Sequence, residues 1–228
     1  EKVLPLGVPV TVGFNRRFDA SHQQLRRQVE ARVIGKIELV QMVCRASIMP
    51  QLEYLRSSGG QMRDQAIHFF DLLRFLTGDE VTTVAAMGDA LALAEIAEFD
   101  DVDTSILMLR MRGGALAQLD NTRRTGHGYD ERISLLGPDG VLESGSQTTR
   151  GVTLWQGERR IQPGLYPDWF SRVEGSYYAH LDAFVRSLGG EEVADLPGLL
   201  DGLRAQAIAE AAVLSLQQGQ FVSVETLA

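Results

Sequence analysis

The chain has 228 residues, 44% of them hydrophobic and 23% charged, and its 22 Lys and Arg oppose 30 Asp and Glu for a formal net charge of −8. This composition is typical of a globular protein and excludes wholesale disorder. The acidic balance disfavours nucleic acids and anionic membranes as partners. No apolar stretch approaches the roughly 18 residues of a membrane span. The single cysteine, Cys44, excludes an internal disulfide and favours a reducing, cytoplasmic compartment.

The first residues predict the end of one element followed by a buried strand. Residues 8–14 are rich in valine, as strands are, and residues 4–6 resemble the end of a helix that stops at Gly7. The length corresponds to about one and a half domains of about 150 residues each. We therefore expect further structure upstream of this strand and one whole domain after it.

Periodicity predicts the remaining elements in chain order. A helix at 22–33 with Ser21 as its N-cap precedes a strand at 37–44, a loop at 47–60 and a helix at 63–76. Strand patterns follow at 81–88, 104–112, 115–123, 132–136 and 152–155, with a hairpin at Gly113-Gly114 and a turn at 137–140. Helices at 168–188 and 197–217 and a short strand at 222–224 close the chain. Helices on one face of a mostly antiparallel sheet define an α+β domain.

The helix at 63–76 carries the main candidate chemistry. Asp64, His68 and Asp71 fall on one stripe of a helix that is otherwise almost entirely apolar. The spacing places Asp64 beside His68, where a carboxylate can orient the ring of a general base. Two other interpretations stay open: the stripe is the solvated edge of the helix, or it supplies two ligands of a metal site.

Two further segments place polar side chains where a ligand can bind. Arg16 and Arg17 follow the strand at 8–14, and an arginine at the end of a core strand suits either a polyol or phosphate ligand or a surface ion pair. The loop at 121–130 includes His127 and Tyr129, although most loops are polar without a functional reason.

Two apolar features are typical of core packing rather than of a ligand site. Cys44 lies in a strand pattern and is interpreted as a small buried hydrophobic residue. The helix at 168–188 carries an apolar stripe, for which core packing is favoured over a cofactor site. Its members are Tyr177, Tyr178, Leu181, Phe184 and Val185.

Several motifs in a fixed order resemble one enzyme family. They are Gly13-Phe14-Asn15-Arg16-Arg17-Phe18-Asp19, Ser58-Gly59-Gly60, the helix pattern Asp64-x-x-x-His68-x-x-Asp71-x-x-Arg74, Gly128-Tyr129-Asp130-Glu131-Arg132, Tyr177-x-x-x-Leu181-x-x-Phe184 and Asp201-Gly202-x-x-Ala205. The ordered set resembles the glucose–fructose oxidoreductase and inositol dehydrogenase (Gfo/Idh/MocA) family over essentially the whole chain. Within that family it is most similar to inositol 2-dehydrogenases.

The resemblance implies a nucleotide-binding Rossmann domain followed by an α+β domain for substrate binding and oligomerisation. No Gly-x-Gly-x-x-Gly occurs in the chain. We therefore expect residues 1–14 to be the terminal fragment of the Rossmann domain and residues 15–228 to be the substrate-binding domain. The cofactor would be NAD or NADP, bound mainly by residues outside this sequence.

The resemblance also implies roles for individual residues. His68 would accept the proton of the reacting hydroxyl. Asp64 would orient His68 and form a hydrogen bond with the substrate. The substrate would further contact Arg16, Tyr129 and Asp71. The nicotinamide cofactor would contact Asn15, Arg16, Trp169 and Arg172. No metal ligand is expected.

The sequence therefore predicts an oxidoreductase that transfers a hydride from a hydroxyl-bearing carbon of inositol, or of a related sugar or polyol, to NAD(P). Two alternatives come from other classes: a non-catalytic module for sugar binding or oligomerisation, and a metal-dependent sugar isomerase or hydrolase. The uncovered face of the sheet is expected to pack against further copies of the chain in a homodimer or homotetramer.

Overall fold

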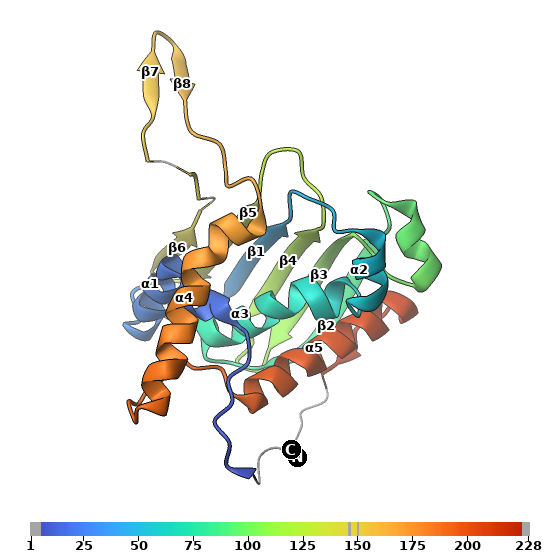
Figure 1. Cartoon of the computed structure of the whole chain (residues 1–228), viewed down its shortest axis with the longest axis horizontal. Helices are drawn as coiled ribbons and strands as arrows, with labels where there is room; N and C mark the ends of the chain where they lie inside the picture. Colours follow the sequence, from blue (N-terminus) through green and yellow to red (C-terminus); the bar gives the residue numbers. More distant parts are fainter. Residues whose placement is uncertain (1–5, 146, 150, 225–228) are drawn as a thin grey trace.

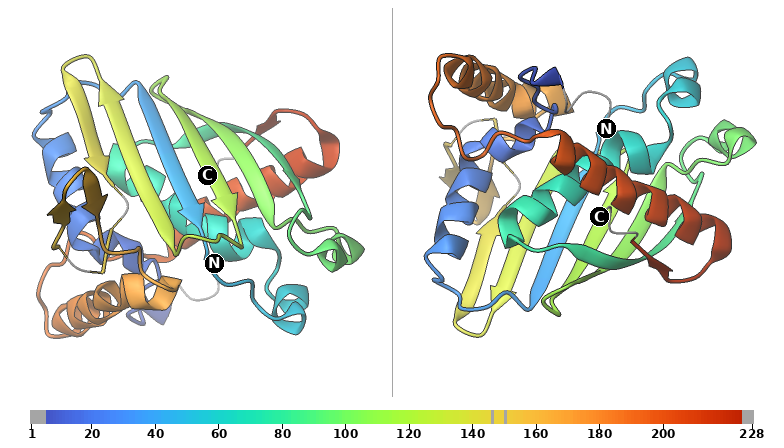
Figure 2. Two further views of the ribbon diagram at one scale, coloured as in Figure 1. Left: turned by 90° about the horizontal axis from the view of Figure 1, so that it is seen from above. Right: turned by 90° about the horizontal axis from the view of Figure 1, so that it is seen from below.

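The computed structural model describes residues 6–145, 147–149 and 151–224. A seven-stranded sheet forms the centre of the molecule, and its helices gather on one face (Figure 1). Seen from below, the helices lie in front of the sheet, whereas the view from above shows its strands uncovered (Figure 2). A small hairpin, β7–β8, projects away from this body. The expected α+β class is confirmed.

The large sheet has the strand order β6-β5-β1-β4-β3-β2-β9. Its strands are β1 (Leu39–Arg45), β2 (Val81–Asp89), β3 (Thr104–Met111), β4 (Leu116–Thr122), β5 (Asp130–Gly137), β6 (Gly140–Ser144) and β9 (Val222–Ser223). All neighbours pair antiparallel except β1 and β4, which lie parallel in register Leu39 to Leu116. The C-terminal ends of β1 and β4 therefore lie side by side.

The helices are α1 (Ala20–Glu30), α2 (Leu52–Ser57), α3 (Ile67–Thr77), α4 (Trp169–Leu188) and α5 (Leu199–Gln218). A π-helical turn, η3 (Met62–Ala66), leads directly into α3, and two 3₁₀ turns, η2 (Asn15–Phe18) and η4 (Ala94–Phe99), complete the set. α3 ends at Gly78, whose φ of 64° is the left-handed conformation that glycine adopts without strain, and its amide donates to Arg74 O.

Alternation along the strands produces the core. In β1 the side chains of Val40, Met42 and Cys44 are buried and face the helices, while their neighbours face the uncovered side. α3 is buried on most of its surface, as its apolar sequence predicts. α5 contributes small residues such as Ala205 and Ala209, which let it approach α3 and β2 closely.

Most expected elements occur within a few residues of their predicted bounds. The structure adds α2 inside the expected loop at 47–60, the strand β6, and the strands β7 (Leu154–Gln156) and β8 (Arg159–Ile161) where one strand was expected. The N-cap of α1 is Asp19 rather than Ser21, because the Asp19 carboxylate accepts from the amides of Ser21 and His22.

The prediction of a buried strand at 8–14 is wrong for the described chain. These residues are extended but pair with no strand among those described, and Val8 and Val10 are exposed. The segment is attached instead by Val12 N, which donates to Pro197 O, and by Thr11, whose hydroxyl contacts His180. A strand needs a hydrogen-bonding neighbour, which local composition cannot supply. The helix end predicted at 4–6 falls mainly on residues 1–5, outside the described part.

The prediction that the apolar stripe of α4 belongs to the core is also wrong. Tyr178, Leu181 and Val185 are 65%, 59% and 64% exposed. The buried side of α4 is instead mixed, with the polar Arg172, Ser176 and His180 beside the apolar Val173 and Ala183. Burial of this side is stabilised by ion pairs, which periodicity alone does not reveal.

Two adjacent arginines connect the N-terminal segment to the rest of the fold. Arg17 donates to both carboxylate oxygens of Asp71 in α3, at 2.8 and 2.5 Å, and lies 2.9 Å from Asp201 of α5. Arg16 donates to Glu131 of β5 at 3.0 Å. One short turn is therefore joined to both helices and to the sheet by buried charge pairs.

Replacement of Asp71 by Asn is expected to lower the free energy of unfolding by about 3 kcal/mol, because the buried Arg17 loses its bidentate partner and keeps only Asp201. Urea titration of the 228-residue chain measures this change. Glu98→Gln, which breaks the exposed pair with Arg56, is the control and is expected to change the free energy by less than about 1 kcal/mol. Equal effects of the two variants would contradict the structural role of Asp71.

Candidate active site

The candidate site lies where β1 and β4 end and the turn η3 crosses them. Gln65 of this turn donates to Thr122 O, the last residue of β4, at 3.0 Å and also contacts Cys44 Sγ. Gly60, just before the turn, has a φ of 89°, and a Cβ there would lie 2.9 Å from Asp101 Oδ1. π-helical turns are rare in proteins, and many of those that occur lie at functional sites, because they displace side chains from the regular helical spacing.

His68 occupies the first turn of α3 and is half-buried. Its Nδ1 is buried without a hydrogen-bond partner in the described chain, and its ring meets that of Phe14 edge-on with 6.1 Å between centroids. Burial, together with the charge of Arg16, lowers the pKa of His68 to about 3. The imidazole is therefore neutral at physiological pH, which is the form that can accept a proton.

Asp64 lies one turn before His68, but its carboxylate bonds to other groups. Its Oδ1 accepts from the Tyr54 hydroxyl at 2.6 Å and its Oδ2 from Arg123 Nη1 at 2.8 Å. The spacing thus places Asp64 and His68 one turn apart on the same helical segment. The Asp64 carboxylate nevertheless bonds to side chains of α2 and of the loop after β4. A role for Asp64 in orienting His68 stays a prediction.

Arg16 and Tyr129 lie together in a buried hydrogen-bonded cluster behind His68. Arg16 Nη2 donates to the Tyr129 hydroxyl at 2.9 Å, and that hydroxyl donates to Glu131 Oε2 at 3.0 Å. Burial raises the pKa of Tyr129 well above its usual value. Burial alone would raise the pKa of Glu131 as well, but the electrostatic influence of Arg16, His22 and Arg172 holds it below the usual range.

The other predicted site residues are spread around this cluster. Arg172 donates to Asp19 at 2.6 Å and to Glu131 at 3.4 Å, so it joins the buried charges. Asn15 is buried and bonds to Ser176, with its Oδ1 unpartnered. Trp169 is 46% exposed at the start of α4 and packs against Phe170 and Tyr177. Asp71 is the exception, because it is buried against Arg17 away from any open surface.

Sequence reasoning missed Tyr54, Gln65, Arg123 and the buried Glu131 as parts of the site. Arg123 belongs to the polar loop at 121–130, and Glu131 belongs to the motif at 128–132. Both therefore lie in segments that the sequence patterns already indicate as candidate sites. Tyr54 lies in a helix that the sequence did not predict. Arg123 Nε and Nη2, both amide atoms of Asn121 and Gln65 Oε1 are buried without a described protein partner, which is unusual away from functional sites.

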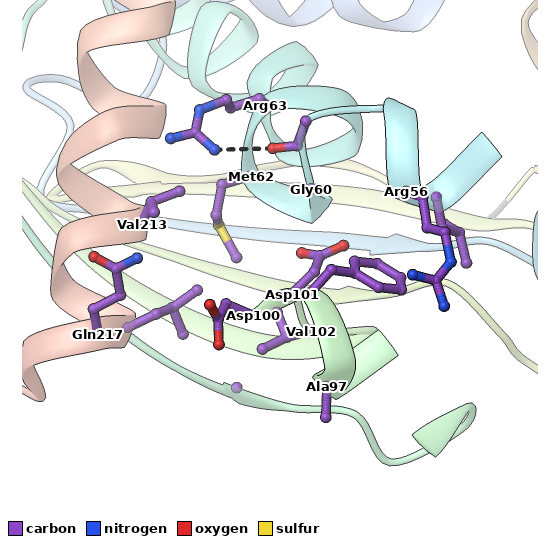
Figure 3. A pocket seen from close by; sticks show the side chains of 15 residues that line it. Arg56, Gly60, Met62, Arg63, Ala97, Asp100, Asp101, Val102, Val213 and Gln217 are labelled. Atoms are coloured by element: carbon purple, nitrogen blue, oxygen red, sulfur yellow. Dashed lines mark hydrogen bonds between the residues drawn. The ribbon is translucent and has the colours of Figure 1, made fainter. Parts of the chain in front are cut away.

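A separate pocket of about 480 Å³ opens between η4, α5 and the start of the turn η3 (Figure 3). Its floor is apolar and includes Met62 and Val213, and Arg56, Arg63 and Asp100 line it as well. None of the residues predicted for the active site lines this pocket. Its size therefore says nothing about the chemistry at His68.

Comparison with known proteins assigns the chain to a family. Residues 22–143, more than half of the chain, match the GFO/IDH/MocA C-terminal domain. The fold and the His68 site thus belong to a domain of this class, and the chain is a member of the GFO/IDH/MocA family. The resemblance seen in the sequence motifs is confirmed.

Several relatives of the chain are named as inositol dehydrogenases. The chain is 35% identical over 99% of its length to the myo-inositol 2-dehydrogenase of Thermotoga maritima, of which it covers 67%. The crystal structure of a probable dehydrogenase from the same organism matches 98% of the chain and 67% of that protein with a TM-score of 0.92 at 34% identity. A scyllo-inositol dehydrogenase from Lactobacillus casei, crystallised with NAD(H) and scyllo-inositol, matches 98% of the chain and 67% of that protein with a TM-score of 0.86 at 25% identity. The chain spans 54–67% of the length of the curated relatives that it matches.

The described residues offer only part of a site for a nicotinamide cofactor. A dinucleotide needs a glycine-rich turn for its pyrophosphate, and the chain has none. The unpartnered Oδ1 of the buried Asn15 and the exposed ring of Trp169 suit the nicotinamide end of such a molecule. Among the described residues, no group of three or more His, Cys, Asp or Glu side chains could hold a metal ion, and no helix is long and apolar enough to cross a membrane.

The lowered pKa of His68 predicts a pH-dependent contribution to stability. The unfolded chain binds a proton at this histidine below about pH 6.5, whereas the folded chain does so only near pH 3. His68 therefore destabilises the fold as the pH falls through this range, by up to about 1.4 kcal/mol per pH unit. The free energy of unfolding of wild type minus that of His68→Gln should fall with this slope between about pH 6 and pH 4. A pH-independent difference would show that His68 titrates normally.

Proposed function

We propose that this chain is the substrate-binding part of an NAD-dependent oxidoreductase that oxidises a hydroxyl group of inositol or of a related polyol. The observation that carries the proposal is the half-buried, neutral His68, next to the fixed carboxylate of Asp64 at the ends of β1 and β4. Support comes from the relatives, which include proteins named inositol 2-dehydrogenase and a structure with NAD(H) and scyllo-inositol. Use of NADP instead of NAD stays open to test.

In this proposal His68 accepts the proton of the reacting hydroxyl, and Asp64 accepts a hydrogen bond from the substrate. The bound nicotinamide supplies the acceptor for the hydride. Arg16 and Tyr129 support the site from behind, since both are buried in the cluster with Glu131. The charge of Arg16 also disfavours a protonated His68, so the base is free before the reaction.

We further propose that residues 1–14 belong to a nucleotide-binding domain and residues 15–228 to the substrate-binding domain. The curated relatives are longer than the chain by about one third of their own length. Val8 and Val10 are exposed in an extended segment, and the apolar stripe of α4 is exposed as well. Both surfaces suit cover by a further domain, whose cofactor would then lie near Asn15, Arg16, Trp169 and Arg172.

In the full-length protein, His68→Ala is expected to reduce turnover of myo-inositol by a factor of about 100 to 10,000, the usual contribution of a general base. The polyol should still bind with a similar KM, because Asp64 and Arg123 are unchanged. Spectrophotometric assay of NADH and NADPH formation across a panel of inositols and sugars measures both constants. Unimpaired turnover by His68→Ala would remove the base assignment, and absence of oxidation by wild type with every polyol would remove the proposed function.

The uncovered face of the sheet is the proposed contact between copies of the chain. It exposes Ile106 and Met108 of β3, Leu116 of β4, Leu136 of β5 and Val141 of β6. Apolar side chains spread over one face of a sheet are typical of an interface, because monomers rarely expose such contiguous patches. A homodimer or homotetramer would bury them.

Met108→Asp should therefore shift the protein from a dimer or tetramer to a monomer, because a carboxylate would be buried without a partner in the interface. Sedimentation equilibrium reports the change. Leu181→Lys on the exposed side of α4 is the matched control and should leave the mass unchanged. Loss of assembly in the control, but not in Met108→Asp, would place the interface on α4.

The proposed location is the cytoplasm. Cys44 is 1% exposed, and burial raises the pKa of its thiol to about 12, which makes it unreactive. The chain has no other cysteine and therefore gains nothing from an oxidising compartment.

A further inference from the structure

The carboxylate of Asp64 is held at both oxygens by side chains from two other elements. Tyr54 reaches it from α2 at 2.6 Å, and Arg123 reaches it from the end of β4 at 2.8 Å. Asp64 itself comes from the π-helical turn, and its side chain keeps 21% of its surface exposed. One partly open carboxylate thus joins three segments that are distant in sequence.

Arg123 is placed and enclosed in a way that favours this contact. Its amide donates to Asp103 O at 2.8 Å, which fixes the backbone beside β3. Its side chain is 3% exposed, and Asp64 is its only ion-pair partner in the described chain. A buried guanidinium with a single carboxylate partner stays close to that carboxylate, because separating the pair would leave a buried charge without compensation.

The remaining donors of Arg123 indicate that its charge matters more than a complete set of hydrogen bonds. Nε and Nη2 are buried without a described partner, which is costly for a guanidinium. Structural arginines in this protein are more fully bonded: Arg17 binds Asp71 with two donors, and Arg74 binds Glu80 with two. Departures from full hydrogen bonding concentrate at functional sites.

The contact also decides which way Asp64 faces. With one oxygen on Tyr54 and the other on Arg123, neither forms a hydrogen bond to His68. Each oxygen keeps a further lone pair, and the side chain is partly exposed, so the carboxylate can still accept from a ligand hydroxyl.

We propose that Arg123 and Tyr54 are positioning residues that hold the Asp64 carboxylate in the orientation that accepts a hydrogen bond from a substrate hydroxyl. This inference rests on the proposed function for the identity of the ligand, a polyol. Asp64 then fixes the substrate, while the separate neutral imidazole of His68 receives its proton. A purely structural role for the same contacts, as a link between α2, η3 and β4, makes different predictions.

Tyr54→Phe gives the sharpest test, because the tyrosine is 49% exposed and loses only its hydroxyl. In the full-length enzyme, assayed with myo-inositol and NAD, we expect KM to rise about fivefold to tenfold, the effect of one ordinary hydrogen bond, with kcat nearly unchanged. The unfolding midpoint should stay at its wild-type value. A lowered midpoint with unchanged KM would overturn the proposal in favour of a structural link.

Arg123→Ala tests the cationic donor. KM for myo-inositol should rise about tenfold or more with kcat nearly unchanged, because Asp64 Oδ2 loses the charged group that holds it. Arg123→Lys, or guanidinium ion added to Arg123→Ala at a non-denaturing concentration, should largely restore the wild-type KM. An unchanged KM, or a defect that neither treatment rescues, would overturn the role of Arg123.

The matched control is Arg63→Ala. Arg63 precedes Asp64 on the same turn, but it pairs with Glu210 of α5 at 2.6 Å on the side of the separate pocket. Its loss should change neither KM nor kcat. An effect equal to that of Arg123→Ala would show that any weakening of this turn impairs the site, and would overturn the specific assignment.

A measurement without catalysis separates this inference from the proposed function. Binding of myo-inositol to the full-length protein can be measured by isothermal titration calorimetry, and the Kd should rise about fivefold or more in Arg123→Ala and in Tyr54→Phe relative to wild type. A wild-type protein that binds a polyol but oxidises none would remove the proposed function and leave the positioning roles to this binding test. An unchanged Kd in both variants would overturn the positioning roles, whatever the activity.

Discussion

The ion pairs of the adjacent Arg16 and Arg17 attach the turn η2 both to the helices and to the sheet. Arg17 is tied to Asp71 and Asp201 on the helical side, while Arg16 is tied to Glu131 in the sheet. The pairs with Asp71 and Glu131 are buried on both sides, so loss of either carboxylate leaves a buried arginine with fewer partners. The two arginines therefore fix the distance between α3 and β5, and the position of His68 depends on both.

The same charges control the chemistry that the site can perform. Arg16 lies near enough to lower the pKa of His68, and burial contributes the larger part of that effect. The nearby carboxylates that could oppose it are already engaged: Glu131 with Arg16 and Arg172, and Asp64 with Arg123. The result is a neutral imidazole that lies one turn after a carboxylate held by two other side chains, so the site offers both a proton acceptor and a hydrogen-bond acceptor.

Polar and apolar surfaces are distributed in an unusual way over α4 and the sheet. α4 turns its charged side inward to reach Asp19 and Glu131 and leaves Tyr178, Leu181 and Val185 outside. The uncovered face of the sheet is likewise apolar at Ile106 and Met108. Two separate faces thus remain available for contacts, one near the N-terminal segment and one on the opposite side of the sheet from the helices.

The sequence by itself determined the order of most elements, the α+β class, the buried nature of α3 and the presence of His68 and Asp64 on one turn of structure. Local periodicity and turn residues carry that information, because side-chain direction repeats with backbone geometry. Only the tertiary structure decided the partners of the charges. Asp71 meets Arg17, and Asp64 meets Arg123 rather than His68, because those cations come from segments tens of residues away. The π-helical turn, the inward polar side of α4 and the unpaired segment at 8–14 were likewise invisible, since each depends on what packs against it.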